Sequence, residues 1–214
     1  FGAIVDGHLL DRPLSQTFAA GRQAPVPYIA GSTSDEASVF GLMGFDAAVL
    51  RERFGIELAA VRGAYEADGP VPEAKLLRLV QTDFIFTSAA LGMSALAARK
   101  APAWSYHFDY VPPAERADAA GAPHCADMPH LFGIEEAARD PASPGRMLRQ
   151  YWLNFIRTGD PNGADLPRWD GARPGAQRLL LVQGDVATAT SLRPAAMVLW
   201  QQRWKTESGA PVLP

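Results

Sequence analysis

The sequence predicts an α/β protein, in which the strands of one sheet alternate along the chain with helices that cover it. Three short segments, 26–31, 103–110 and 179–182, have the apolar or alternating patterns that are typical of strands. The stretches between and after them carry apolar residues three and four positions apart, which is typical of amphipathic helices. These strands make a thin sheet for so much helix. We therefore expect further strands either in parts of the chain with weaker patterns or in a segment that precedes Phe1.

The N-terminal part of the chain contains the first strand and a helix start. Turn signals rich in Gly and Pro over 1–23 predict an extended lead-in. The apolar run 26–31 closes on Gly31 and predicts a buried strand. The polar residues 32–35 are N-cap types, so a helix is expected from about Glu36. In chain order, the helices expected after this one span 47–54, 57–67, 72–80, 87–100, 144–157 and 194–205.

Residues 103–110 form the clearest strand. Strict alternation predicts an aromatic face and a polar face: Trp104, Tyr106, Phe108 and Tyr110 on the first, Ser105, His107 and Asp109 on the second. Pro112 and Pro113 end the strand, and a loop runs on to Gly121. Two successive strands therefore deliver first Glu36 and later His124 at their ends.

Composition and charge exclude several classes of protein. A hydrophobic fraction of 48% over 214 residues is that of an ordinary globular protein, expected to be soluble, either in the cytoplasm or outside the cell. The net charge of -3 and the scattered arginines leave no basic stripe for nucleic acid or an anionic membrane. No uninterrupted apolar run reaches the length of about 18 residues that predicts a membrane helix. The single cysteine cannot form an internal disulfide, and a small, weakly charged partner is expected.

The side chains best suited to chemistry gather in 121–133, which holds two of the four histidines and the only cysteine. An acid at one strand end and a histidine at a later one are the two supporting members of a nucleophilic triad. The carboxylate orients the imidazole, and the second ring nitrogen takes the proton of the nucleophile. Spacing alone leaves two simpler interpretations open: Glu36 complements a helix N-terminus, and His124 is a solvated loop residue.

A metal site is the second interpretation of this loop. Four possible zinc ligands lie within seven residues: His124, Cys125, Asp127 and His130. Two prolines stiffen the loop, and no second Cys or His pair lies elsewhere to close a structural site, so we expect no metal. A catalytic Cys-His pair is disfavoured because adjacent side chains rarely reach each other in line. His8 and His107 are interpreted as a turn residue and a residue of the polar strand face.

Motif-like stretches are spread along most of the 214 residues. In chain order they are Val5-Asp6-Gly7, Val26 to Gly31 with Asp35-Glu36, Tyr106 to Tyr110, Gly121 to His124 with Asp127 and Leu131-Phe132-Gly133, Trp152 to Phe155, Thr158 to Asn162, and Pro167-Arg168-Trp169. Together they resemble the type-B carboxylesterase family, which includes bacterial para-nitrobenzyl esterases and the cholinesterases. The resemblance implies that residues 1–214 are the C-terminal part of a single α/β-hydrolase domain, with a few strands of its central sheet and covering helices.

The resemblance also implies site residues and an activity. Glu36 matches the triad acid, His124 the triad base, and Asp127 a supporting acid one turn beyond the histidine. The implied activity is hydrolysis of a small-molecule carboxylic ester by a serine esterase that needs no cofactor. The chain departs from the family at Ala37, where the family often has Gly, and at Cys125 and His130, which are unusual occupants of their places.

A larger departure is that the sequence contains neither G-x-S-x-G nor a Gly-rich oxyanion-hole segment. In such an enzyme both would lie upstream of Phe1. We therefore expect the chain alone to be inactive, because the covalent step has no attacking group. Its first partner is then the N-terminal part of the same protein. A sheet separated from its neighbouring strands also exposes an edge that favours self-association.

Two other functions stay open at this point. A non-catalytic interaction module on the same fold, as some cholinesterase-like domains are, is disfavoured by the presence of both Glu36 and His124. The residue at the upstream nucleophile position distinguishes it from an esterase. A zinc-binding fragment is the third interpretation.

Overall fold

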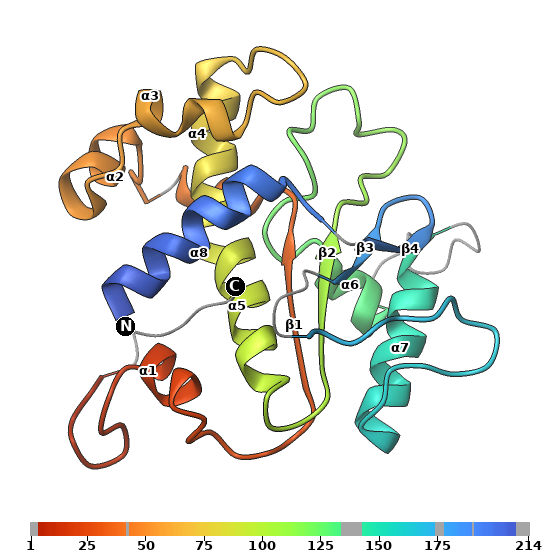
Figure 1. Ribbon diagram of the computed structural model, residues 1–214. Coiled ribbons are helices and arrows are strands. Elements are labelled where there is room, and N and C mark those ends of the chain that lie inside the picture. Colours follow the sequence, from red (N-terminus) through yellow and green to blue (C-terminus); the bar gives the residue numbers. More distant parts are fainter. Residues whose placement is uncertain (1–3, 42, 134–142, 174–177, 190, 209–214) are drawn as a thin grey trace.

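The computed structural model describes residues 4–41, 43–133, 143–173, 178–189 and 191–208. A four-stranded sheet lies between two groups of helices (Figure 1). Its strands are β1 (Tyr28–Thr33), β2 (Ala103–Phe108), β3 (Leu179–Val182) and β4 (Val186–Ala189). They follow the order β1-β2-β3-β4, with the first three parallel and β4 antiparallel to β3. The predicted α/β class is confirmed.

The helical segments have the following bounds: α1 (Leu14–Ala19), the 3-10 helix η1 (Glu36–Phe40), α2 (Ala47–Phe54), α3 (Leu58–Val61), the 3-10 helix η2 (Arg62–Ala64), α4 (Glu73–Thr82), the π-helix η3 (Asp83–Thr87), α5 (Ser88–Ala97), α6 (Asp127–Phe132), α7 (Gly145–Thr158) and α8 (Pro194–Ser208). In Figure 1, α4, α5 and α8 lie to one side of the sheet, and α6 and α7 lie to the other. Each side has its own hydrophobic core, one around Phe84 and Trp200 and one around Tyr151 and Trp169.

Local signals explain the elements whose predicted bounds are confirmed. The Asp46 carboxylate caps α2 by accepting the N–H groups of Ala48 and Val49, at 2.9 and 3.1 Å. Gly55 ends the same helix in the left-handed conformation, with φ 61°. Strand β3 has the predicted bounds 179–182, because its uninterrupted Leu-Leu-Leu-Val run suits a strand buried between neighbours.

Several expectations about the elements were wrong or incomplete. The N-terminal segment is not extended throughout, because Pro13 precedes the short helix α1. The helix at Glu36 is a single 3-10 segment, and the one expected over 57–67 divides into α3 and η2. Strand β4 and helix α6 were not predicted, since both are short and neither has a long apolar pattern.

The face of β2 that was predicted to be polar is buried. Ser105 and His107 are only 1% and 2% exposed, because α5 covers this side of the sheet. The imidazole Nδ1 of His107 lies 3.0 Å from the Ser32 hydroxyl, which lies 3.0 Å from the Thr87 hydroxyl. Burial, followed by the nearby Arg193 charge, lowers the pKa of His107 to about 3, against a smaller opposing effect of Asp109. His107 is thus a neutral core residue.

Acid is expected to destabilise the protein through His107. Because its folded pKa lies below the ordinary histidine value of 6.5, the unfolded state binds the proton first as the pH falls. The stability contribution is intact above pH 6.5 and decreases as the pH falls toward 3. Between pH 7.5 and 4.5 we expect a loss of about 3 kcal/mol from this one residue. Urea unfolding at both pH values measures it, and His107→Gln should lower the loss by that amount while His8→Gln leaves it unchanged. An equal loss in wild type and His107→Gln would contradict the assignment.

Helices α4, η3 and α5 form one continuous helical stretch, Glu73–Ala97. By length and composition this stretch could cross a membrane, although 67% of its most apolar window is buried inside the protein. It differs from the uninterrupted apolar run sought in the sequence, because polar residues such as Gln81 and Asp83 interrupt it. A buried core helix has the same apolar composition, and the burial of this stretch accounts for its apolar composition here.

The π-helix η3 holds a buried ion pair. Asp83 is fully buried, and Arg193, which precedes α8, contacts it through two nitrogen-oxygen pairs of 2.7 and 2.5 Å. Burial alone would lower the pKa of Arg193, but the Asp83 carboxylate outweighs this effect and raises it. The indole N–H of Trp200 donates to the Tyr65 hydroxyl in the same region at 2.7 Å. The ion pair therefore fastens α8 to the long helical stretch.

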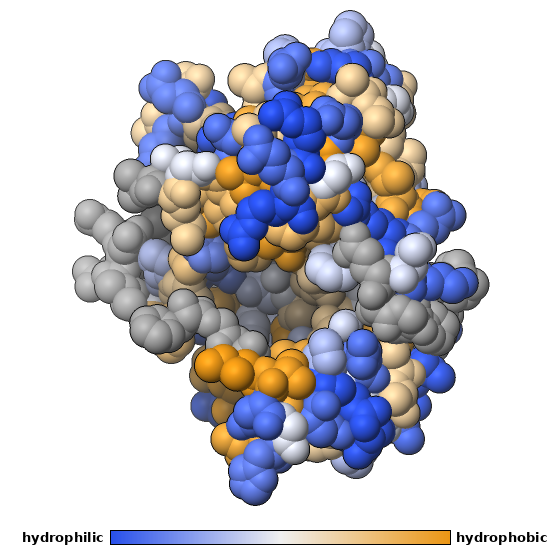
Figure 2. Space-filling view, turned by 90° about the vertical axis from the view of Figure 1, so that its left-hand side faces the viewer, coloured by the Kyte–Doolittle hydropathy of each residue, from blue (hydrophilic) through white to orange (hydrophobic). Residues whose placement is uncertain are grey.

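The face on the left of Figure 1 carries exposed apolar residues near the N-terminus. In Figure 2, which shows this face, one group of hydrophobic residues lies in the lower part, at the height where Figure 1 places α1 and the segment before it, and others lie among hydrophilic residues in the upper part. In that segment Ile4 and Leu9 are 76% and 85% exposed. Such a concentration of exposed apolar side chains is typical of a surface that contacts another polypeptide.

Candidate active site

Two parallel strands bring the candidate acid and histidine to the same edge of the sheet. Thr33 at the end of β1 is in register with Phe108 at the end of β2. The chain continues from Thr33 directly to Glu36, whereas after β2 it makes a long loop before it returns to His124. The return is marked by a parallel bridge between Asp35 and Pro123. Residues 88 positions apart in the sequence therefore meet.

The two oxygens of Glu36 have different partners. Oε1 accepts the backbone N–H of Thr33 at 2.7 Å, and Oε2 forms a short hydrogen bond with Nδ1 of His124. The Glu36 side chain is 5% exposed and that of His124 is 35% exposed. Because a carboxylate only accepts hydrogen bonds, it favours the proton on Nδ1 and leaves a lone pair on Nε2. Within the part of the chain that the structure describes, Nε2 has no hydrogen-bond partner.

The backbone and ring of His124 are held by further contacts. Its N–H donates to the Ser38 hydroxyl at 2.8 Å, and its ring lies against Phe86 with the ring centroids 5.4 Å apart. The next residue, Cys125, is exposed and adopts a left-handed conformation with φ 65°. Burial, followed by the charges of Asp127 and Glu36, raises the pKa of its thiol, so the thiolate is disfavoured.

Asp127 lies at the start of α6 and contacts β2 rather than the imidazole. Its Oδ2 accepts the Tyr106 hydroxyl at 2.6 Å, and both residues are buried. Burial and the Asp127 charge raise the pKa of Tyr106, which keeps the phenol protonated as the donor. The Tyr106 ring lies over Gly31 of β1, where a Cβ would be 2.3 Å from a ring atom. Glycine at position 31 thus allows the hydroxyl to reach Asp127.

Sequence reasoning missed three supporting residues. Tyr106 was interpreted only as a core aromatic, and Ser38 was not singled out. Arg78 of α4 forms a two-point ion pair with Asp35, the residue before Glu36, in which Nε lies 3.0 Å from Oδ1. A serine two positions after a candidate acid is a weak signal for Ser38. The sequence has no local signal for Arg78, because the contact depends on where α4 lies.

The four possible zinc ligands point to different partners. His124 faces Glu36, Asp127 faces Tyr106, and Cys125 is exposed. His130 is buried against Phe108 and Tyr110, and its Nδ1 lies 3.2 Å from the Ser143 hydroxyl. Among the described residues, no group of three or more His, Cys, Asp or Glu side chains could hold a metal ion.

A pocket of about 600 Å³ lies beside the loop that carries His124. Its lining includes Asp35, Arg78 and Pro123 from the immediate surroundings of the site, and Tyr110, Glu115 and Asp118 from the loop after β2. The pocket lining thus contains three carboxylates, from Asp35, Glu115 and Asp118, and one arginine, Arg78. The segment that precedes His124, which includes Gly121 and Pro123, lines this pocket and also belongs to the candidate site.

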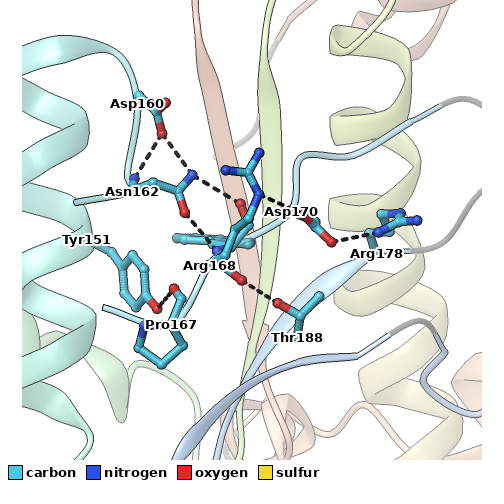
Figure 3. A network of polar contacts seen from close by, with 9 residues as sticks. Tyr151, Asp160, Asn162, Pro167, Arg168, Asp170, Arg178 and Thr188 are labelled. Carbon is cyan, nitrogen blue, oxygen red and sulfur yellow. Dashed lines mark hydrogen bonds and ion pairs between the residues drawn. The ribbon is translucent and has the colours of Figure 1, made fainter. Parts of the chain in front are cut away.

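The motif around 158–170 packs against the sheet (Figure 3). Asp160 accepts both the backbone and the side-chain N–H groups of Asn162, at 2.9 Å each. The Asn162 amide in turn pairs with both the N–H and the carbonyl of Trp169, at 2.8 and 3.1 Å. The buried Trp169 indole donates to the Ser105 carbonyl of β2 at 3.0 Å. This motif thus fixes β2, the strand that carries Tyr106, and contributes no reacting group to the site.

A sequence model of the carboxylesterase family matches residues 61–200, which is well over half of the chain. The chain belongs to the carboxylesterase family. The resemblance seen in the motifs is thereby confirmed. The matched region contains β2, His124, Asp127 and the Asp160 to Trp169 motif, so the network of Figure 3 lies in the part of the chain that matches the family.

Individual relatives agree with this assignment. The chain is 32% identical to a phenmedipham hydrolase of Pseudarthrobacter oxydans over an aligned length of 144 residues, and this alignment covers 62% of this chain and 29% of the relative. It is 27% identical to an acylcarnitine hydrolase of Rattus norvegicus over 199 residues, with coverage of 78% and 35%. The chain thus spans about a third of the length of these two relatives.

Solved structures show the same fold. The carboxylesterase EST55 of Geobacillus stearothermophilus at pH 6.2 superimposes with a TM-score of 0.73 at 23% identity, covering 94% of this chain and 46% of that one. EstA of Aspergillus niger gives a TM-score of 0.76 at 21% identity, covering 98% and 45%. The chain therefore has the fold of somewhat less than half of each of these two proteins.

Proposed function

We propose that this chain supplies the acid and the base of a serine carboxylic-ester hydrolase. The observation that carries the proposal is the hydrogen bond that Nδ1 of His124 donates to Glu36, with Nε2 left open at the carboxyl ends of two parallel strands. A buried acceptor on one ring nitrogen and an accessible lone pair on the other is the arrangement that a general base requires. Membership of the carboxylesterase family supports the same reaction.

The reaction proceeds in two stages, acylation and deacylation. In acylation, Nε2 of His124 takes the proton of a serine hydroxyl as its oxygen attacks the ester carbonyl, and the imidazolium then protonates the departing alcohol. In deacylation, Nε2 takes a proton from water, the hydroxide attacks the acyl-serine, and the proton returns to the serine oxygen. Glu36 keeps its charge throughout and stabilises the imidazolium in both stages.

The serine comes from a segment outside this chain, which contains no G-x-S-x-G. Within the described residues, β1 has a strand partner on one side only, and this strand has no charge and no proline on its open edge. Natural edge strands usually carry such residues to prevent pairing. Strand β1 is therefore suited to an interior position, next to a strand of the N-terminal part of the same protein. An open edge also favours self-association of the isolated chain.

Asp127 has a supporting role in this proposal. Its hydrogen bond to Tyr106 holds the first turn of α6 against β2, just beyond His124. Asp127 thus anchors the far end of the histidine loop and does not contact the reacting atoms. The single domain that includes residues 1–214 is completed by the N-terminal part, and a small-molecule ester is its substrate.

Hydrolysis of a para-nitrophenyl ester tests the proposed function. The isolated chain should release no nitrophenol above the uncatalysed rate, because it holds no nucleophile. The chain extended by the residues that precede Phe1 in its open reading frame should be active and should be labelled by a fluorophosphonate on a serine of the added part. Turnover by the isolated chain would contradict the proposal. Another residue at the upstream nucleophile position would favour a non-catalytic interaction module.

A further inference from the structure

Two serine side chains join the segment that carries the acid to the segment that carries the histidine. The N–H of Ala122 donates to the Ser34 hydroxyl at 2.8 Å, and the N–H of His124 donates to the Ser38 hydroxyl at 2.8 Å. Between these two bonds, the N–H of Asp35 donates to the carbonyl of Ala122 at 2.9 Å. The three bonds tie one short stretch, 34–38, to another, 122–124.

These hydroxyls replace backbone acceptors where strand pairing ends. Strands β1 and β2 are paired up to Thr33 and Phe108, and after β1 one isolated parallel bridge follows among the described residues, between Asp35 and Pro123 of the later loop. Proline has no N–H to donate, so a regular ladder cannot extend through position 123. The N–H groups on either side of Pro123 instead reach the two serine side chains. Close approach is possible because residue 121 is glycine, where a Cβ would lie 2.7 Å from the Ser34 hydroxyl.

Ser38 and Glu36 together hold His124 at two points. Both lie in η1, so one rigid turn binds the ring through Nδ1 and the backbone through the N–H. With the ring hydrogen bond alone, the backbone of His124 could shift, and the imidazole could rotate about the bond between Nδ1 and Glu36. The second attachment removes this freedom just before the left-handed turn at Cys125. The Ser38 N–H donates to the Asp35 carbonyl at 3.1 Å, a further hydrogen bond that holds Ser38 in this turn.

We propose that Ser38, assisted by Ser34, is a positioning residue that fixes Nε2 of His124 where the nucleophile must meet it. This inference rests on the proposed esterase function for its catalytic consequence, but its structural part concerns this chain alone. Small misplacements of a catalytic group lower rates strongly, with a shift of about 1 Å costing on the order of 100-fold. A backbone N–H that loses its acceptor allows a shift of that kind.

The structural part is tested by NMR on the chain with ¹⁵N-labelled histidine. The proton between Nδ1 of His124 and Glu36 should exchange slowly with solvent in the wild type. In Ser38→Ala we expect this proton and the His124 amide to exchange at least about tenfold faster, as local opening becomes easier. Ser38→Thr retains a hydroxyl and should restore slow exchange. Ser191→Ala, which changes an exposed serine, is the control and should leave the exchange rate unchanged.

The catalytic part is tested in the chain extended upstream. Ser38→Ala should lower kcat by about 10- to 100-fold with little change in KM, because a displaced base slows chemistry and not binding. Ser34→Ala, farther from the ring, should give a smaller effect in the same direction and serves as the second variant if Ser38→Ala does not fold. Unchanged Nδ1 exchange and unchanged kcat in Ser38→Ala, in a protein whose activity His124→Ala abolishes, overturn this inference. Activity that survives His124→Ala overturns the proposed function and leaves the exchange result standing.

Discussion

In the chain extended upstream, Glu36→Gln should lower kcat for a para-nitrophenyl ester by about four orders of magnitude, with a smaller change in KM. The physical reason is the direction of one hydrogen bond. The Thr33 N–H holds the oxygen that Glu36 presents as Oε1, so the amide nitrogen of glutamine must face His124. This nitrogen donates, Nδ1 becomes the acceptor, and the proton moves to Nε2. The imidazole then cannot accept the proton of the serine.

Three further variants show whether this explanation is right. His124→Ala should cost at least as much as Glu36→Gln, and the double variant should cost little more than His124→Ala alone, because the two residues act as one unit. Asp127→Asn is the matched control, since its amide oxygen can still accept the Tyr106 hydroxyl. We expect it to change kcat by no more than about tenfold. Near-normal turnover by His124→Ala or Glu36→Gln would remove the basis for both assignments.

Replacing Arg193 by methionine should lower the free energy of unfolding by about 3 to 5 kcal/mol, because a buried carboxylate then has no counter-charge. Asp83 is fully buried and receives two charge-assisted contacts from Arg193. Methionine fills a similar volume, so the loss reports the charge and not a cavity. Urea unfolding at constant pH, followed by far-UV circular dichroism, measures the change.

Two companion variants separate the ion pair from general effects of removing an arginine. Arg168→Met breaks a pair with Asp170 in which the arginine side chain is 82% exposed, and should cost less than about 1 kcal/mol. The double variant Arg193→Met with Asp83→Leu removes both charges and should recover much of the lost stability. Equal effects of Arg193→Met and Arg168→Met would show that the buried pair does not fasten α8.

The sequence predicts features whose causes are local. The Asp46 cap and Gly55 determine the bounds of α2, and both can be identified within a dozen residues. Strand β2 was predicted by alternation, but alternation states only that the two faces differ. It cannot show that α5 covers the polar face, so His107 was assigned to a polar surface and is instead a neutral core residue.

The residues of the candidate site also fall into two groups, those that the sequence predicts and those that only the fold reveals. Glu36, His124 and Asp127 were selected because they follow recognisable strand and loop patterns and match family motifs. Arg78, Tyr106 and Ser38 were missed because their contacts join residues 43, 21 and 86 positions apart, which only the fold brings together. The possible zinc ligands of the loop also turn to different partners, which their closeness in sequence could not show.

The open edge of β1 gives the chain a practical use as half of a split reporter. If the acid and the base reside in one polypeptide and the nucleophile in another, ester hydrolysis becomes a signal that the two have associated. Fusing each half to one member of a binding pair would convert that association into a colour change. Charged substitutions on the outward edge of Tyr28–Thr33 would then adjust the background, because they weaken spontaneous strand pairing and leave Glu36 and His124 on the same half.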